Sequence, residues 1–330
     1  MAVTAVSYHD TVNDLQGLPF TASGPFSRPE WFALLEASGA RPVIALARDG
    51  DDAVALPLMQ QGSGLDILTN WYAFTWTDLA TNHVRREALL GDLARSLATR
   101  ASRITLSKLP DEDGTASRFE RAFRKAGWTV FREICDTNHI LTLAGHDYAD
   151  YLAGRPGKLR TTLKRKAKKV EVEILEHFDA DGWASYEYVY GHSWKPEEGD
   201  PALLRRFAQQ EGAAGRIRLG LARHDGEVIA AQFWTVENGT AYIHKLAHLE
   251  SAKPLSAGTT LTAALFRHVI DRDHVEKVDF GTGNDPYKAD WMEETRPRYR
   301  LTCMRAGDPR NWPAIARSML RKLVSGERAG

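Results

Sequence analysis

The sequence predicts an α+β fold in two domains. A chain of 330 residues is long enough for about two hydrophobic cores of ordinary size. The turns Asp225-Gly226 and Asn238-Gly239 separate three runs of strand-like residues in the second half, which predicts antiparallel hairpins. Helical and strand-like segments alternate, as is typical of α+β domains. The elements expected in this half are helices at 157–170, 181–192, 201–211 and 258–271 and strands at 170–174, 216–223, 227–236, 240–247 and 277–280.

The first half follows the same logic. Ser27 can cap a helix over 27–36, in which Pro29 occupies the first turn and Trp31, Leu34 and Leu35 form an apolar face. Further expected elements are strands at 42–48, 53–59, 103–108, 129–132 and 139–143 and helices at 83–100 and 115–126. We place the boundary near residue 145, which gives domains 1–145 and 146–330.

Composition excludes several classes of protein. The 43 basic and 43 acidic residues balance, so nothing global indicates binding to DNA. Cys135 and Cys303 have no partners at metal-ligand spacing, and we expect neither a disulfide framework nor a metal site. The N-terminus lacks the pattern of a signal peptide, and no apolar run is long enough to cross a membrane. We therefore expect a cytoplasmic protein.

The segment 155–169 departs from this balance. It carries eight basic residues and no acid: Arg155, Lys158, Arg160, Lys164, Arg165, Lys166, Lys168 and Lys169. A solvated helix face is the usual explanation of a charge run. Eight like charges repel one another, however, and a bound polyanion would relieve the repulsion. Arg160 and Lys164 are our candidates for contacts with a phosphate-bearing ligand, an acyl-carrier protein, a tRNA acceptor stem or anionic lipid.

A second candidate site is the turn that opens the helix at 258. The N-terminus of a helix presents unpaired N–H groups and a positive dipole end, which suit a pyrophosphate. Gly258 permits close approach of the backbone, and hydroxyl groups flank it. The cofactor-binding candidates are Ser256, Ala257, Gly258, Thr259 and Thr260. Simple helix capping would produce a similar pattern.

Several motifs together resemble a known family. Ala230-Ala231-Gln232-Phe233, Tyr242 to Ala247, Ser256-Ala257-Gly258, and Asp279-Phe280-Gly281-Thr282-Gly283 through Tyr287-Lys288 look like the FemAB-related, CelD-like acyltransferases of the GNAT superfamily. Ser193-Trp194-Lys195 and Asn70-Trp71-Tyr72 also match. The resemblance covers about residues 25 to 305. It implies two tandem GNAT-like domains, and the first is expected to be degenerate because residues 60–110 contain no comparable glycine turn opening a helix.

The resemblance also indicates where the chemistry would occur. In related enzymes a lysine of the Asp-Phe-Gly…Tyr-Lys ending lies near the reacting carbonyl, so Lys288 is the candidate for oxyanion stabilisation, with Tyr287 and Asp279 beside it. The alternative is that Asp279 and Lys288 hold the loop. Strand alternation places Tyr242, His244 and Leu246 on one face and Ile243, Lys245 and Ala247 on the other. His244 is a candidate base or a structural histidine, and Lys245 is a candidate for carrier binding.

The leading interpretation is an N-acyltransferase that uses acyl-CoA or acyl-carrier protein. The acceptor would be an amine of a sugar, a lipid such as a sphingoid base, or an amino acid. The alternatives are an aminoacyl-tRNA-dependent ligase of the Fem type, although no long helical arm is evident, and an inactive GNAT scaffold. Trp194 and Tyr72 are further substrate-binding candidates, and Trp194 could equally be core. The C-terminal basic, apolar helix suits either the inner membrane surface or docking onto the protein.

Overall fold

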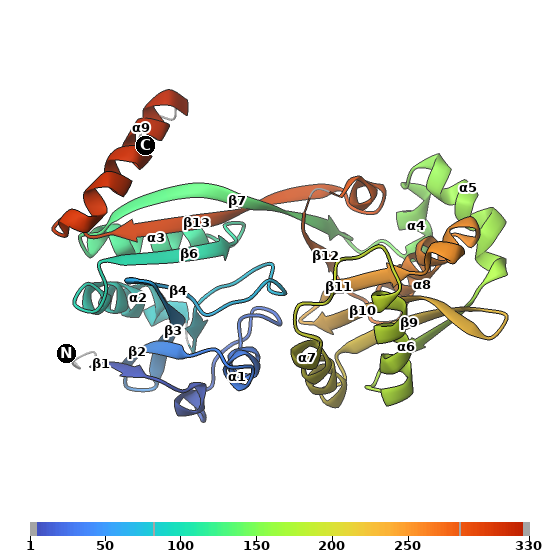
Figure 1. The fold of residues 1–330 in the computed structure, drawn as a ribbon, viewed down its shortest axis with the longest axis horizontal. Coiled ribbons are helices and arrows are strands. Elements are labelled where there is room, and N and C mark those ends of the chain that lie inside the picture. The colour runs from blue at the N-terminus through green and yellow to red at the C-terminus, as the bar shows by residue number, and fades with distance from the viewer. Residues whose placement is uncertain (1–4, 82, 284, 326–330) are drawn as a thin grey trace. The chain divides into compact units, whose positions relative to one another are not determined.

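The computed structural model describes residues 5–81, 83–283 and 285–325. The chain forms two compact units, the first made of residues 1–137 with 297–330 and the second of residues 138–296. Both units combine helices with a largely antiparallel sheet (Figure 1), which confirms the predicted α+β class.

The first unit contains a run of antiparallel strands followed by a parallel pair. Strands β1 to β4 pair in sequence order as antiparallel neighbours, β4 pairs parallel with β6, and β6 pairs antiparallel with β13. Its strands are β1 (Ala5–His9), β2 (Pro42–Asp49), β3 (Asp52–Gln61), β4 (Gly64–Ile67), β5 (Leu79–Ala80), β6 (Arg103–Leu109) and parts of β7 (Thr129–Thr142) and β13 (Glu294–Met304). Its helices are η1 (Val12–Leu15), α1 (Pro29–Ala37), α2 (His83–Leu97), α3 (Thr115–Lys125), η5 (Pro309–Asn311) and α9 (Trp312–Ser325).

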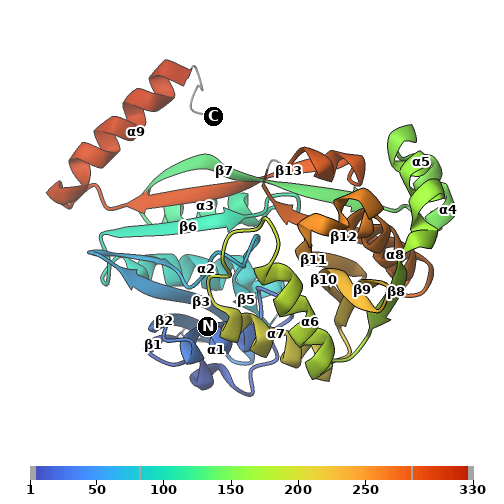
Figure 2. The same ribbon diagram turned by 45° about the vertical axis from the view of Figure 1, so that its right-hand side comes forward.

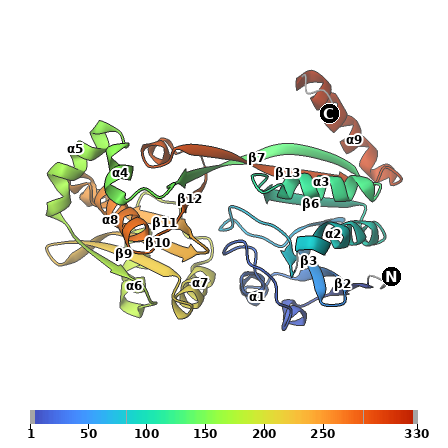
Figure 3. The same cartoon turned by 180° about the vertical axis from the view of Figure 1, so that it is seen from behind.

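Helices α2 and α3 pack together, and α2 covers β2 and β3 (Figure 3). Side chains such as Phe119, Phe123 and Trp76 are fully buried beneath them. Unlike α2 and α3, the last helix, α9, projects away from the body of its unit (Figures 1 and 2). Its Trp312, Met319 and Leu320 are each more than half exposed.

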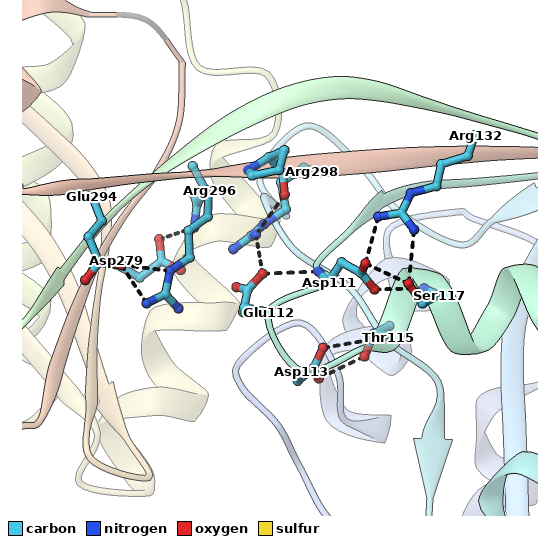
Figure 4. Close-up of polar contacts among 12 residues, drawn as sticks. Asp111, Glu112, Asp113, Thr115, Ser117, Arg132, Asp279, Glu294, Arg296 and Arg298 are labelled. Carbon is cyan, nitrogen blue, oxygen red and sulfur yellow. Dashed lines mark hydrogen bonds and ion pairs between the residues drawn. The ribbon is translucent and has the colours of Figure 1, made fainter. Parts of the chain in front are cut away.

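The acidic loop before α3 is held by its own neighbours (Figure 4). Asp111 accepts hydrogen bonds from the backbone and hydroxyl of Ser117 at 2.8 Å and from Arg132 at 2.7 Å. Asp113 accepts from the backbone and hydroxyl of Thr115. These carboxylates accept the hydrogen bonds of donors in the first turn of α3 and of a neighbouring arginine. Their clustering therefore has a structural explanation.

The second unit has the same order of strands. Strands β8 to β11 form consecutive antiparallel pairs, β11 pairs parallel with β12, and β12 pairs antiparallel with the end of β7. The strands are β8 (Glu171–Leu175), β9 (Ile217–His224), β10 (Glu227–Glu237), β11 (Thr240–His248) and β12 (Lys277–Thr282). The helices are α4 (Tyr148–Ala153), α5 (Gly157–Lys166), η2 (Ala167–Lys169), α6 (Ala180–Gly191), α7 (Pro201–Ala213), η3 (Glu250–Leu255), α8 (Ala257–Asp271) and η4 (Pro286–Asp290).

Helices cover both faces of this second sheet. Phe233 packs edge-to-face on Trp183 of α6, whereas its neighbour Trp234 packs edge-to-face on Phe266 of α8. Because successive strand residues point to opposite faces, α6 and α8 lie on opposite sides of β10. Helices α4 and α5 pack on α8. The sheet therefore has an α8 face and an α6/α7 face.

The structure differs from the sequence prediction at several elements. Strand β7 is continuous through residues 133–138, where no alternating pattern predicts a strand, and β1, α4 and β13 were not predicted. The chain passes from one unit to the other inside β7 and returns inside β13. The predicted boundary lies instead at the left-handed turn Ala144-Gly145, just after β7. The predicted second domain also includes residues 297–330, which group with the first unit.

Candidate active site

The parallel pair β11 and β12 separates soon after it forms. Among the described residues, β12 pairs with β11 through Thr240 to Tyr242, opposite Lys277 to Asp279. Beyond that point β11 continues to His248 and is paired with β10 on its other edge. Unpaired strand edges present N–H and C=O groups that can bind an extended ligand containing amides. This edge leads directly to the turn before α8.

Helix α8 begins at that turn in a fixed geometry. Ser256 adopts the left-handed conformation (φ 55°, ψ 39°), and its carbonyl accepts the first helical hydrogen bond, from Thr260. Gln232 of β10 donates to Gly258 O at 3.2 Å and to Thr262 Oγ1 at 2.7 Å, which ties the first turn to the sheet. The amides of the first turn precede any helical acceptor, so the turn can donate them to an anion.

The five residues predicted to bind the cofactor do not all face outward. Ala257 and Thr260 are buried, and the Thr260 hydroxyl is turned into the interior, while Ser256, Gly258 and Thr259 are partly exposed. A Cβ atom at Gly258 would lie 3.1 Å from Cδ2 of His248. The turn can therefore bind a ligand through its backbone, Ser256 and Thr259.

The basic helix α5 lies beside this turn. Leu159 and Leu163 anchor it in the core, and the Lys166 ammonium donates to Ser256 Oγ at 3.3 Å. Arg155 is not part of the surface charge, because it is buried against Trp291 O and paired with Glu293. Within the described part of the chain, no acid lies within ion-pair distance of the other seven basic residues: Lys158, Arg160, Lys164, Arg165, Lys166, Lys168 and Lys169. Arg160 and Lys164 are exposed there.

The end of β12 brings three predicted residues together. The buried Asp279 accepts two hydrogen bonds from Asn138 Nδ2, at 2.9 and 2.8 Å, and one from Gly281 N at 2.8 Å. Lys288 is also buried and donates to Thr282 O at 2.5 Å. Tyr287 packs edge-to-face on Phe280. Burial raises the pKa of the Tyr287 hydroxyl, with the Asp285 charge adding to the effect, so the phenol stays protonated at neutral pH.

The predicted alternation along β11 is wrong because the strand contains a bulge. The register shifts between Phe233 and Trp234, which pair with Lys245 and Ile243, and His244 is the extra residue. Ile243 belongs to the core on the α8 face. His244 and Lys245, predicted to lie on opposite faces, both lie on the α6/α7 face.

His244 is closely surrounded on that face. Its ring lies 5.0 Å from the Phe233 ring and 5.2 Å from the Phe207 ring, and its Nε2 is 2.8 Å from Thr235 Oγ1. These contacts fix the ring within the sheet, as expected for the structural alternative.

Lys245 forms an ion pair that the sequence did not predict. Its ammonium lies 2.9 Å from Glu198 Oε1 and 5.1 Å from the Tyr190 ring centroid. Burial lowers the pKa of Lys245 to about 8, opposed by Glu198 and assisted by Lys195. Glu198 lies in the irregular segment between α6 and α7, where no periodic pattern marks it.

The other two predicted substrate-binding residues, Trp194 and Tyr72, lie in different units. Trp194 is 46% exposed and its ring lies tilted against His248, with ring centroids 4.2 Å apart. This contact brings the segment between α6 and α7 to the end of β11, beside the α8 turn. Tyr72 is buried in the first unit, where its amide bonds to Asn70 Oδ1 and its ring contacts Trp71.

Two further observations concern the described residues as a whole. No three histidine, cysteine or acidic side chains in this part of the chain are placed to hold a metal ion. None of its helices combines the length and apolar character that crossing a membrane requires.

Comparison with known proteins agrees with the fold. No curated protein sequence matched this chain significantly. FemX has 11% identity and a TM-score of 0.61 over 89% of this chain and 96% of its own. L-PGS from Bacillus licheniformis has 13% identity and a TM-score of 0.57 over 93% and 99%. The C-terminal domain of an Agrobacterium fabrum protein, named as a lysylphosphatidylglycerol synthetase, has 12% identity and a TM-score of 0.58 over 88% and 91%.

These similarities cover both units, which confirms the predicted fold of two tandem GNAT-like domains. The sequence match is more local. Residues 157–289 match the acetyltransferase (GNAT) domain family. That range includes α5, the strands β11 and β12, the turn that opens α8 at Ser256 (the α8 turn) and Lys288. Most of the second unit is therefore similar to a GNAT acetyltransferase domain.

Proposed function

We propose that this protein is an N-acyltransferase that transfers an acyl group from acyl-CoA to an amine, with acyl-carrier protein as the alternative donor. The observation that carries the proposal is the α8 turn. It joins an unpaired strand edge, suited to the amides of a pantetheine arm, to a helix N-terminus suited to a pyrophosphate. Lys166 at Ser256 continues this site into the cations of α5, which suit a further phosphate.

The end of β12 supplies the groups proposed for the chemistry. The Lys288 ammonium is buried at the end of β12, and its contact with Thr282 O fixes its direction. We assign Lys288 to stabilising the oxyanion. As the new C–N bond forms and the C–S bond breaks, the protonated Tyr287 gives its proton to the departing thiolate and takes up the proton that the amine nitrogen loses. Asp279 holds the strand end through Asn138 and Gly281. His244, fixed between two rings, is assigned a structural role.

The cations of α5 also fit a second candidate function. An aminoacyl-tRNA-dependent ligase would bind an RNA phosphate backbone at the same surface, and the FemX and L-PGS structures share the fold. A chain that bound none of CoA, acyl-carrier protein and tRNA would instead be an inactive scaffold. Titrations with CoA, acyl-carrier protein and tRNA separate the three possibilities.

We also propose a peripheral location at the inner face of the cell membrane. Helix α9 exposes Trp312, Met319 and Leu320 and carries Arg317 and Arg321 without an acid between 312 and 325. Exposed aromatic and apolar groups combined with arginines favour the interface of an anionic bilayer.

The test of the donor site is calorimetric titration with CoA. Gly258→Val should weaken binding more than tenfold, or about 1.4 kcal/mol, because the new side chain would enter the space between the turn and His248. Gly307→Val is the matched control, since a Cβ at Gly307 meets no atom within 4 Å. Unchanged CoA affinity in a folded Gly258→Val protein would place the donor site elsewhere.

A further inference from the structure

A cavity of about 490 Å³ lies on the α6/α7 face of the second unit. Trp183, Tyr186 and Tyr190 form its aromatic wall and recur on one side of α6, at spacings of three and four residues. Pro196 of the following segment and Pro201 and Leu204 of α7 complete the wall. The cavity can therefore accept an apolar carbon skeleton.

Its charged lining is mostly acidic. Glu187, Glu197 and Glu198 line the cavity, and Lys195 is the one cation among the described lining residues. Glu187 is already engaged by Trp183 Nε1 at 2.8 Å and by Arg205 at 3.8 Å. The cations that balance Glu187 and Glu198, which are Arg205 and Lys245, do not line the cavity themselves. A ligand would therefore contact mostly carboxylates, which favour a cation that displaces Lys245 from Glu198 over a phosphate or carboxylate.

Lys245 shows that an ammonium can be held at this site. Its Nζ lies between the Glu198 carboxylate, at 2.9 Å, and the face of Tyr190, 5.1 Å from the ring centroid. A carboxylate together with an aromatic face is the usual environment of a bound ammonium. The side chain of Lys245 thus occupies the position that a ligand ammonium would take.

The cavity is connected to the proposed donor site. The segment between α6 and α7 that lines it also carries Trp194, whose ring contacts His248 beside Gly258. Lys195, which lines the cavity, directly follows Trp194. A ligand in the cavity would therefore lie near the α8 turn.

We propose that this cavity binds the acyl acceptor as a cationic amine on an apolar skeleton, with its ammonium between Glu198 and Tyr190. For acyl transfer the ammonium first gives a proton to the Glu198 carboxylate, and the resulting neutral amine attacks the thioester. The role of this ligand as acceptor rests on the proposed acyltransferase function, but its binding does not. Lys245 competes with the ligand for Glu198. Amino sugars rich in hydroxyl groups and acidic amino acids are poor ligands for such a lining.

The test uses matched pairs of probes that differ in charge. Phenethylamine and octylamine are titrated calorimetrically into the full-length protein beside 2-phenylethanol and 1-octanol. At least one amine should bind ten times or more tightly than its alcohol. Equal affinity within both pairs, or no binding of either amine, would overturn the proposal.

Variants then locate the site. Glu198→Gln keeps the shape of the side chain and should weaken amine binding at least tenfold. Lys245→Met removes the competing cation and should tighten it severalfold, an effect that a merely structural lysine would not produce. Glu227→Gln, exposed at the start of β10, is the control. Unchanged amine affinity in a folded Glu198→Gln protein would reject the site.

Parallel titrations with CoA and acyl-carrier protein separate the two proposals. Amine binding without binding of CoA or acyl-carrier protein would overturn the acyltransferase proposal but leave the cavity assignment intact. CoA binding without amine binding would do the reverse.

Discussion

The two units contain the same strand–helix–strand arrangement and use it differently. In the second unit, α8 connects the parallel strands β11 and β12, and in the first unit α2 follows β4 and precedes its parallel partner β6. The α8 turn contains Gly258, and Ser256, Gly258 and Thr259 are partly exposed at the start of the helix. The segment before α2 instead carries a buried carboxylate, Asp78.

Asp78 occupies the beginning of α2 with an internal ion pair. Arg86, in the first turn of α2, donates from Nε and Nη2 to its two carboxylate oxygens at 2.7 Å, and Thr77 donates a further hydrogen bond. Arg118 also lies within ion-pair distance of Asp78, so this carboxylate and its arginines satisfy one another. The comparison shows that one topology can begin its helix either with partly exposed residues or with a buried ion pair, according to the residues at the helix start.

The largest expected effect is on stability in the first unit. Asp78→Asn preserves volume but leaves the half-buried Arg86 without its counter-charge, and should lower the free energy of unfolding by roughly 3–5 kcal/mol. CoA affinity should not change in protein that remains folded. Urea unfolding measures the first quantity and calorimetry the second.

A control pair lies on the same helix. Arg85 pairs with Asp49 at a more exposed site, so Asp49→Asn should cost about 1 kcal/mol or less. Acid provides a second check. Burial alone would raise the pKa of Asp78, but Arg86 lowers it below the ordinary value of 3.8. The stabilisation is therefore complete above that value and is lost as the pH falls through the lower folded pKa. Equal losses from both variants would contradict the structural role of Asp78.

The next largest effect concerns catalysis in the second unit. Lys288→Met retains most of the side-chain length and removes the charge. Turnover should fall about a hundredfold or more, with the KM for the donor nearly unchanged, because a cation at a developing oxyanion contributes roughly 3–4 kcal/mol. Asp279→Asn should have a smaller effect. Near-normal turnover together with a lower Tm would show that Lys288 only clamps the loop at Thr282 O.

The sequence predicted what depends on local patterns. The Asp225-Gly226 and Asn238-Gly239 hairpins, the start of α8 at the Gly258 turn and the basic helix α5 all have short-range signals. Signals of this kind require only propensity and spacing.

The rest depends on contacts between distant residues. The bulge that places His244 on the same face of the sheet as Lys245 depends on pairing with β10, and no residue type in β11 predicts it. The continuous β7 depends on its partner strands, since the polar and apolar residues in its middle, from 133 to 138, do not alternate. Glu198 joins the site through Lys245, 47 residues later in the chain. Such features follow from tertiary structure that periodicity does not encode.

The smallest expected effect compares the basic helices of the two units, which have different surroundings. Lys164 and Arg165 of α5 are exposed near the α8 turn, whereas Arg317 and Arg321 of α9 accompany exposed apolar side chains. Reversing either pair to glutamate changes the net charge equally.

The α5 variant should weaken CoA binding about tenfold, or about 1.4 kcal/mol, and added salt should shrink this difference in affinity by screening the charges. The α9 variant should leave CoA affinity unchanged and reduce sedimentation with phosphatidylglycerol vesicles. Since only position differs between the variants, equal losses of CoA affinity would mean that net charge, and not the location of α5, attracts the donor.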